Sequence, residues 1–195
     1  NLIAVRVDNS WTYRERGRKY ARYQWNDRNF NANYGGIPKH VRLHLLPAVY
    51  QTLPLYSNLG TTGIYVYASD FDIAARRAAI HAESEVKNES AAPVALEYEV
   101  QVLDAEGRPV RLADGQGANG TFRGDSFTLR PGETHTFRAR AVAEGLHFWS
   151  WGYGYLYTVK TRLKADGRVM DEAVTRTGFR QTRFDEGRVW LNGRV

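Results

Sequence analysis

The chain has 195 residues, 43% of them hydrophobic and 25% charged, which is the balance of a globular protein and enough for one large domain or one and a half ordinary ones. It contains no Cys, which excludes disulfides, thiolate metal sites and thiol catalysis. No run approaches the roughly 18 apolar residues that a membrane-spanning helix needs, so we expect no membrane partner. Lys and Arg exceed Asp and Glu by 27 to 21, giving a net charge of +6. The 12 Tyr and 5 Trp residues favour β-sheet.

Alternating apolar and polar residues predict β-strands along most of the chain. The expected strands are 2–7, 41–46, 63–68, 76–87, 94–102, 121–129, 137–141, 157–163, 168–176 and 188–192. Asp166-Gly167 between two of them predicts a hairpin turn. No segment makes a convincing amphipathic helix, because 73–83 fits a strand equally well. The fold class predicted is therefore all-β, an antiparallel sandwich.

The sequence divides into three parts. Residues 1–62 are rich in Asn, Tyr and Arg, with irregular loops between a few strands, whereas residues 63–182 hold about seven strands, the size of an immunoglobulin-like domain. Residues 183–195 read as a connector ending on a new strand. Because the chain begins and ends in strand-like sequence, we expect it to be a piece of a longer protein. The compartment stays open, with a periplasmic or secreted location favoured over the cytoplasm.

The motifs that could carry chemistry each have a structural explanation. Gly115–Gly120 matches the glycine spacing of a dinucleotide-binding turn, but it leads from a loop into a strand, not into a helix. His40 and His44 would share a strand face without a third ligand, so no metal site is expected. Paired carboxylates could hydrolyse a glycoside in a cleft. The pairs are Asp70/Asp72, Glu83/Glu85, Glu97/Glu99, Asp171/Glu172 and Asp185/Glu186, and a solvated sheet face is the preferred interpretation. We predict no catalytic residue and no cofactor.

The segment from Trp11 to Asn33 is the most suggestive surface. Its rings could stack on sugars or bases, and its Arg and Asn side chains could bind hydroxyls, carboxylates or phosphates. The ordinary alternative is a loop whose rings pack on the sandwich and whose charges face water. Between the two functional interpretations, the abundance of Asn favours carbohydrate over nucleic acid.

Three segments, in chain order, resemble glycoside hydrolase family 2, the β-galactosidase and β-glucuronidase family. They are Asn1–Asn9, Asn33–Val41, and the run of Tyr155–Val159, Asp166-Gly167, Asp171-Glu172, Gly178–Arg180, Phe184 and Leu191–Gly193. The resemblance implies that 1–62 is the C-terminal part of a sugar-binding, galactose-binding-like jelly roll and that 63–182 is the immunoglobulin-like domain. It also implies that a catalytic (β/α)₈ barrel begins near Leu191–Gly193 and is missing from this chain.

The same resemblance implies the chemistry of the parent protein. Two Glu residues on the barrel would cleave a terminal β-linked sugar by the retaining mechanism. The intact enzyme would therefore bind the carbohydrate substrate, and this chain alone is expected to be inactive. Asn88-Glu89, the one Asn-Glu pair, falls in a loop. In relatives a polar residue before the second motif reaches the sugar. Phe30 stands at that position, so Asn29 or Asn31, with Asn33 and Tyr34 of the motif, are the candidate sugar-binding residues.

Two other classes of function stay open. A free-standing carbohydrate-binding or scaffolding sandwich would bind a glycan without any barrel. A polyanion binder would use the basic run from Arg14 to Arg22, and its affinity would fall steeply with salt. Homo-oligomerisation is also possible for the intact protein, since the sandwich domains could take part in dimer contacts.

Overall fold

The computed structural model describes residues 2–7, 36–37, 39, 41–54, 60–113 and 119–195, which belong to two compact units, Asn1–Leu45 and Leu46–Val195. The described residues of the first unit form no strand. The strands predicted at 2–7 and 41–46 are therefore wrong: both segments are extended and exposed. Alternation shows which side of a segment could be buried, but a strand also needs a neighbour for its backbone hydrogen bonds.

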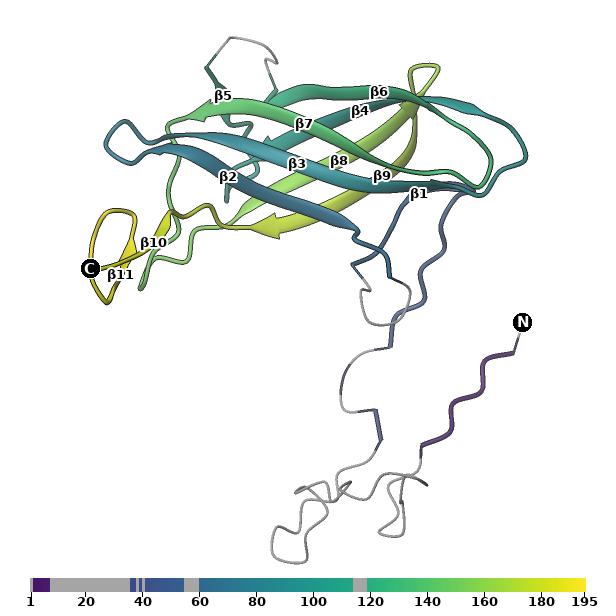
Figure 1. The fold of residues 1–195 in the computed structure, drawn as a ribbon, viewed down its shortest axis with the longest axis horizontal. Helices are drawn as coiled ribbons and strands as arrows, with labels where there is room; N and C mark the ends of the chain where they lie inside the picture. The colour runs from purple at the N-terminus through teal and green to yellow at the C-terminus, as the bar shows by residue number, and fades with distance from the viewer. Residues whose placement is uncertain (1, 8–35, 38, 40, 55–59, 114–118) are drawn as a thin grey trace, which may run out of the picture. The chain divides into compact units, whose positions relative to one another are not determined.

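The second unit is all-β, as predicted, and its described residues contain no helix (Figure 1). Its strands are β1 (Val49–Gln51), β2 (Ile64–Asp72), β3 (Arg77–Asn88), β4 (Val94–Leu103), β5 (Arg111–Leu112), β6 (Thr121–Leu129), β7 (Thr134–Glu144), β8 (Tyr157–Ala165), β9 (Arg168–Thr177), β10 (Thr182–Asp185) and β11 (Arg188–Leu191). Each expected strand from 63–68 onward is confirmed within a few residues, and the ambiguous segment 73–83 falls in the β2–β3 turn and β3.

All strand pairs are antiparallel, and they form two layers joined along one side. β3 pairs with β7 on one edge and with β2 and β1 on the other. In the second layer β4 lies between β6 and β8, and β9 follows β8. β6 joins the layers because Gly124 also pairs with Ala139 of β7. Figure 1 shows the two layers as one strongly twisted sandwich.

The open side of the sandwich is held by β1. The backbone N–H of Gln51 donates to Oδ2 of Asp171 in β9 at 2.8 Å, and the Gln51 side chain donates to the carbonyl of Thr161 in β8 at 3.1 Å. Ser84 Oγ donates in turn to Oε1 of Gln51 at 2.9 Å and contacts the Tyr98 hydroxyl at 2.7 Å. Gln51 and Ser84 are buried, and their hydrogen bonds reach both layers, so β1 joins the edges of both.

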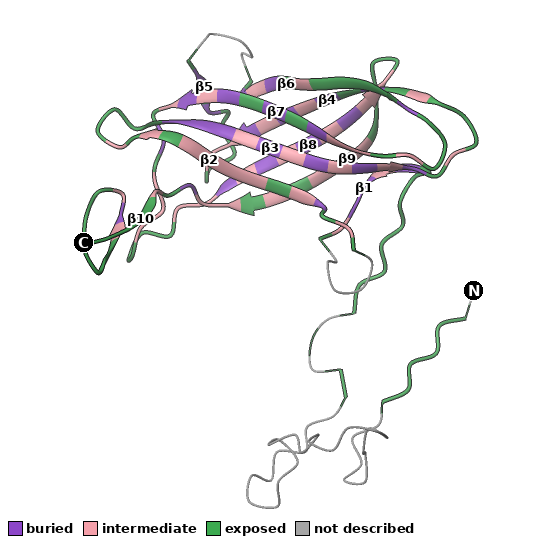
Figure 2. Cartoon of the chain, viewed as in Figure 1, coloured by how far each residue is buried: buried purple, intermediate pink, exposed green. Residues whose placement is uncertain are grey.

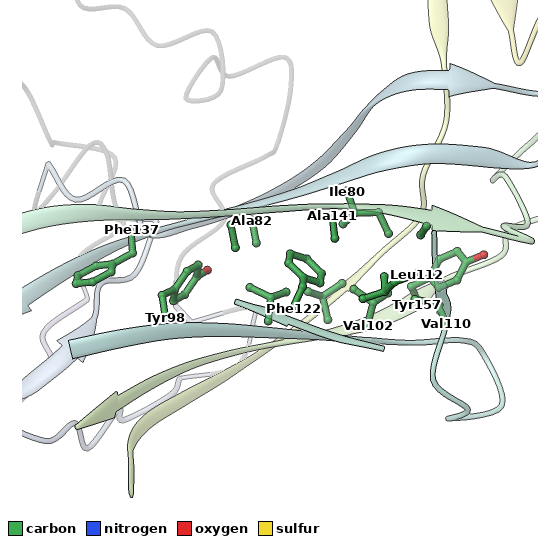
Figure 3. Close-up of a cluster of buried hydrophobic side chains, with 14 of the residues drawn as sticks. Ile80, Ala82, Tyr98, Val102, Val110, Leu112, Phe122, Phe137, Ala141 and Tyr157 are labelled. Atoms are coloured by element: carbon green, nitrogen blue, oxygen red, sulfur yellow. The ribbon is translucent and has the colours of Figure 1, made fainter. Parts of the chain in front are cut away.

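The core lies between the layers, where each strand turns alternate residues inward (Figure 3). Strands β3 and β7 contribute small residues such as Ala82 and Ala141, and these face large ones such as Tyr98 and Phe122 from β4 and β6. Small residues opposite large ones allow close packing of the layers. The alternating burial along the strands is visible as bands in Figure 2.

The predicted Asp166-Gly167 hairpin joins β8 and β9. Both residues have positive φ, +49° and +71°, which a type I′ turn requires. The tail forms a second hairpin, β10–β11, with Glu186 and Gly187 at φ +50° and +69°. The strand expected at 188–192 is therefore confirmed, whereas its partner β10 was not predicted.

Candidate functional site

The candidate sugar-binding residues Asn29, Asn31, Asn33 and Tyr34 lie outside the described residues, and so does the basic run from Arg14 to Arg22. Those predictions stay predictions. The functional features that the structure does place are at the other end of the sequence. They gather where β9 leaves the sandwich and the β10–β11 hairpin begins (Figure 1).

A tight contact between two segments forms the base of this region. The backbone N–H of Trp149 donates to the carbonyl of Phe179 at 2.9 Å. Phe179 is buried and its ring lies 5.1 Å from that of Tyr157. Gly178 leaves no room for a side chain, since a Cβ there would lie 2.8 Å from the Cβ of Trp149 and 2.9 Å from the carbonyl oxygen of Tyr155. The Arg180 guanidinium sits 5.0 Å over the Trp149 ring, a cation–π contact.

Asn192 fastens the hairpin to this base. Its side-chain amide donates to the carbonyl of Trp149 at 2.9 Å, and its Oδ1 accepts the backbone N–H of Gln181 at 2.9 Å. Its own N–H donates to the carbonyl of Gln181 at 2.9 Å. Its φ is +49°, a conformation that Asn adopts more readily than most residues. We call residues 149–153, 178–180 and 182–192 the C-terminal junction.

The C-terminal junction exposes large apolar side chains. Trp151 is 65% exposed and Phe184 79%, and Tyr153 and Val189 are also exposed. Figure 2 shows β10 largely in the colour of exposed residues. A rigid, hydrogen-bonded base that carries several exposed rings is typical of a surface that contacts another protein or domain.

Most carboxylates of the pairs named from the sequence bind other groups in the described part of the chain. Asp70 binds Arg140, Asp171 accepts from Gln51, and Glu172 binds Arg162. Glu83 accepts from Tyr67, Glu85 accepts from Thr52 and Thr62, and Asp185 binds Arg183. These partners are consistent with a structural role on sheet faces and loops.

A general acid for glycoside hydrolysis needs a raised pKa. Where the described carboxyl groups have a displaced pKa, the displacement is downward. The hydrogen bond from Arg140 holds the pKa of Asp70 below its usual range, and the hydrogen bond from Lys87 does the same for Glu89. In the described part of the chain no group of three or more His, Cys, Asp and Glu could hold a metal ion. With no helix in that part, none spans a membrane.

Sequence reasoning found the segments of the C-terminal junction but not the contacts within it. Gly178–Arg180 and Leu191–Gly193 were singled out as motifs, yet the bond from Asn192 to Trp149 joins residues 43 positions apart. One local signal could have shown the hairpin: Glu186-Gly187 separates two short alternating runs, although it is less typical of a hairpin turn than Asn-Gly or Asp-Gly.

A protein-family model described as "Glycosyl hydrolases family 2" matches residues 64–180. A curated relative is a β-glucuronidase of Formosa agariphila, 29% identical over 99% of this chain and 18% of its own length. The chain thus spans less than a fifth of that relative.

Solved structures agree with the observed fold. A β-glucuronidase from glycoside hydrolase family 2 is 26% identical, with a TM-score of 0.64 over 75% of this chain and 14% of its own. A putative β-galactosidase from Bacteroides fragilis is 27% identical, with a TM-score of 0.59 over 75% of this chain and 20% of its own. The similarity again covers a small part of each of those proteins.

Proposed function

Because the chain belongs to glycosyl hydrolases family 2, we propose that it is a non-catalytic part of a retaining exo-β-glycosidase and supports the catalytic domain of that enzyme. The whole protein would hydrolyse a terminal β-linked sugar, a β-glucuronide or a β-galactoside. The reacting carboxyl groups would lie outside this chain, in a domain that follows it. This chain alone would be inactive.

The observation that carries the proposal is the C-terminal junction. Asn192 ties the last hairpin to the Trp149 carbonyl through one side-chain hydrogen bond, and two further hydrogen bonds join it to Gln181, the residue before β10. A domain attached after such an anchor would start from a fixed position and direction, and the exposed Trp151 and Phe184 could pack against it. Positioning of this kind matters because a small displacement of reacting groups costs a large factor in rate.

The substrate class rests on the relatives. The Formosa agariphila relative and one of the two structures described above are β-glucuronidases, and the other is a putative β-galactosidase. The proposal favours a β-glucuronide on that ground, with a β-galactoside as the other substrate to be assayed. The sugar contacts expected from Asn29, Asn31, Asn33 and Tyr34 remain part of the proposal.

The test compares this chain with the parent protein on p-nitrophenyl β-D-glucuronide and β-D-galactoside. We expect turnover by the parent and none by the chain. In the parent, Asn192→Ala should lower activity and the temperature of inactivation, because the hairpin loses its link to Trp149. Asn119→Ala, at an exposed position outside the junction, is the matched control. Turnover by the chain alone, or an Asn192→Ala parent as active and heat-stable as the control, would contradict the proposal.

A further inference from the structure

A cavity of about 640 Å³ opens at the end of the sandwich where β7 ends and β8 begins. Four segments line it: the start of β3 with Arg77, the β4–β5 turn with Arg108, the segment after β7 with His147, and the residues just before β8 with Tyr155. A volume of a few hundred Å³ is the size of a small-molecule site. We call it the end cavity.

One wall of the end cavity contains stacked rings. Tyr155 stacks on His147, with ring centres 4.7 Å apart and planes at 25°, and on Tyr153 at 5.8 Å and 26°. Nη2 of Arg76 donates to Nε2 of His147 at 2.8 Å and to the carbonyl of Gly145 at 2.9 Å. Because a guanidinium only donates, Nε2 accepts and the ring proton lies on Nδ1, 3.2 Å from the Tyr153 hydroxyl. The rings are therefore held in place before any ligand arrives.

The arginines around the end cavity differ in whether they have an ion-pair partner. Arg108 binds Asp104 at 2.8 Å and Glu106 at 2.7 Å, and Arg111 binds Glu144 at 2.8 Å. Arg77 also lines the cavity and is exposed, but no residue in the described part of the chain bonds to its guanidinium. A free guanidinium offers two parallel N–H donors that match a carboxylate.

We propose that the end cavity binds a uronic acid residue of an acidic glycan, with its carboxylate on Arg77 and a face of its ring on the face of Tyr155 that His147 does not cover. The ring faces carry the negative side of the aromatic quadrupole, which attracts the polarised C–H groups of a sugar face. The two contacts together select a sugar that bears a carboxylate over a neutral sugar and over a simple carboxylate. The proposal does not depend on the proposed function, because it concerns binding by this chain alone.

The experiment is a titration of the ¹⁵N-labelled chain with D-glucuronate, D-glucose and acetate at constant ionic strength, followed by amide chemical shifts. D-Glucuronate should move the amides of Gly145 and Leu146, which line the cavity. D-Glucose lacks the carboxylate and acetate lacks the ring, so each should bind at least about tenfold more weakly, which corresponds to about 1.4 kcal/mol.

Variants locate the two contacts. Arg77→Gln should weaken D-glucuronate binding about tenfold or more and leave D-glucose unaffected. Arg176→Gln is the matched control, since Arg176 is also exposed and lies in β9 outside the cavity lining. Tyr155→Leu should weaken D-glucuronate and D-glucose alike. Equal binding of acetate and D-glucuronate, unchanged binding by Arg77→Gln, or shifts away from the cavity would each overturn the proposal. Failure of these tests would leave the hydrolysis assay of the parent protein untouched.

Discussion

Among the described glycines, Gly124 leaves the least room for a side chain, at the point where β6 meets both layers. A Cβ at this residue would lie 2.3 Å from the carbonyl oxygen of Arg138 and 2.8 Å from the side chain of Ala139. The backbone oxygen cannot move without breaking the pairing of β6 with β7. Gly124→Ala should therefore lower the free energy of unfolding by about 2 kcal/mol or more, as overpacking does.

Urea unfolding of the chain measures that loss, and Gly154→Ala is its matched control. A Cβ at Gly154 would meet its nearest neighbour, Nε1 of Trp149, at 3.7 Å, an ordinary contact. The control should change stability by less than about 0.5 kcal/mol. A Gly124→Ala protein as stable as the control would mean that β6 and β7 are not this close in solution.

Tyr157 makes stability depend on pH in the alkaline range. Burial is the largest influence and raises the pKa of Tyr157 to about 12, whereas an unfolded tyrosine has a pKa near 10. Between these values the unfolded state binds fewer protons than the folded state. The contribution of Tyr157 to the free energy of unfolding is therefore fully present below pH 10 and is lost as pH rises towards 12. The loss should amount to about 3 kcal/mol.

Tyr157→Phe tests this contribution by urea unfolding at pH 8 and pH 11. At pH 8 the variant should be less stable by about 1 to 3 kcal/mol, because the backbone N–H of His147 loses its 2.7 Å acceptor. Its further loss between pH 8 and pH 11 should be smaller than that of the unsubstituted chain. Some loss will remain, since burial also raises the pKa of Tyr98. An equal loss in both proteins would show that Tyr157 does not titrate as described.

At the scale of the strands, alternation was a good guide wherever a strand has a neighbour on each side. β3, β4, β7 and β8 each bury every second residue, so their pattern is complete. β1 and β5, with three and two residues, are too short to show a period. The segment 2–7 shows the period without being a strand, because pairing depends on residues far away in sequence.

The same limit applies to the sites. The C-terminal junction and the end cavity bring together segments that are tens of residues apart, such as Arg77 and Tyr155. Motifs marked segments of the junction but not the contacts within it, and no local pattern marks the end cavity, since an Arg that opens a strand and a Tyr that precedes one are ordinary residues. The sequence motifs indicated the family correctly, but the contacts that position the side chains follow from the topology of the sandwich.

A charged ladder across β4, β8 and β9 supports the outer face of the second layer. Glu99 accepts from Lys164 at 2.6 Å and from Arg162 at 3.4 Å, and Arg162 also binds Glu172 at 2.6 Å. Burial acts to raise the pKa of Glu99, but the bonds and charges of Lys164 and Arg162 outweigh it, so this pKa lies below its usual range. Glu99→Gln should cost about 1 to 3 kcal/mol, because the partly buried Lys164 loses its ion-pair partner and Arg162 loses one of two.

Glu97 provides the control for this prediction. It lies two residues earlier on the same face of β4, is exposed, and makes no ion pair with any residue that the structure describes. Glu97→Gln should change the free energy of unfolding by less than about 0.5 kcal/mol. Equal effects of the two substitutions in urea unfolding would show that the ladder does not stabilise the sheet.

At the scale of the whole molecule, the sandwich begins with β1, which pairs with β3. The sequence placed a domain boundary between 62 and 63, whereas the compact unit in the structure starts at Leu46 and includes β1. A chain that begins at Gly63 would lack Gln51, which bonds to Asp171 and Thr161, and Thr52, which donates to Glu85 at 2.8 Å. Ser84 and Asp171 would then each lose a partner at the open side of the sandwich.

Two shortened chains test this boundary by thermal and urea unfolding. The chain from Leu46 should unfold in one cooperative step with the same midpoint as the second unit of the full chain, because its core and its β1 contacts are complete. The chain from Gly63 should be less stable by about 3 kcal/mol or more, since several buried polar atoms lose hydrogen bonds worth about 1 kcal/mol or more each. Its amides at the free edges of β3 and β9 should also exchange faster. Equal stability of the two chains would place the boundary at 62/63 and reduce β1 to a connector that passes along the sandwich.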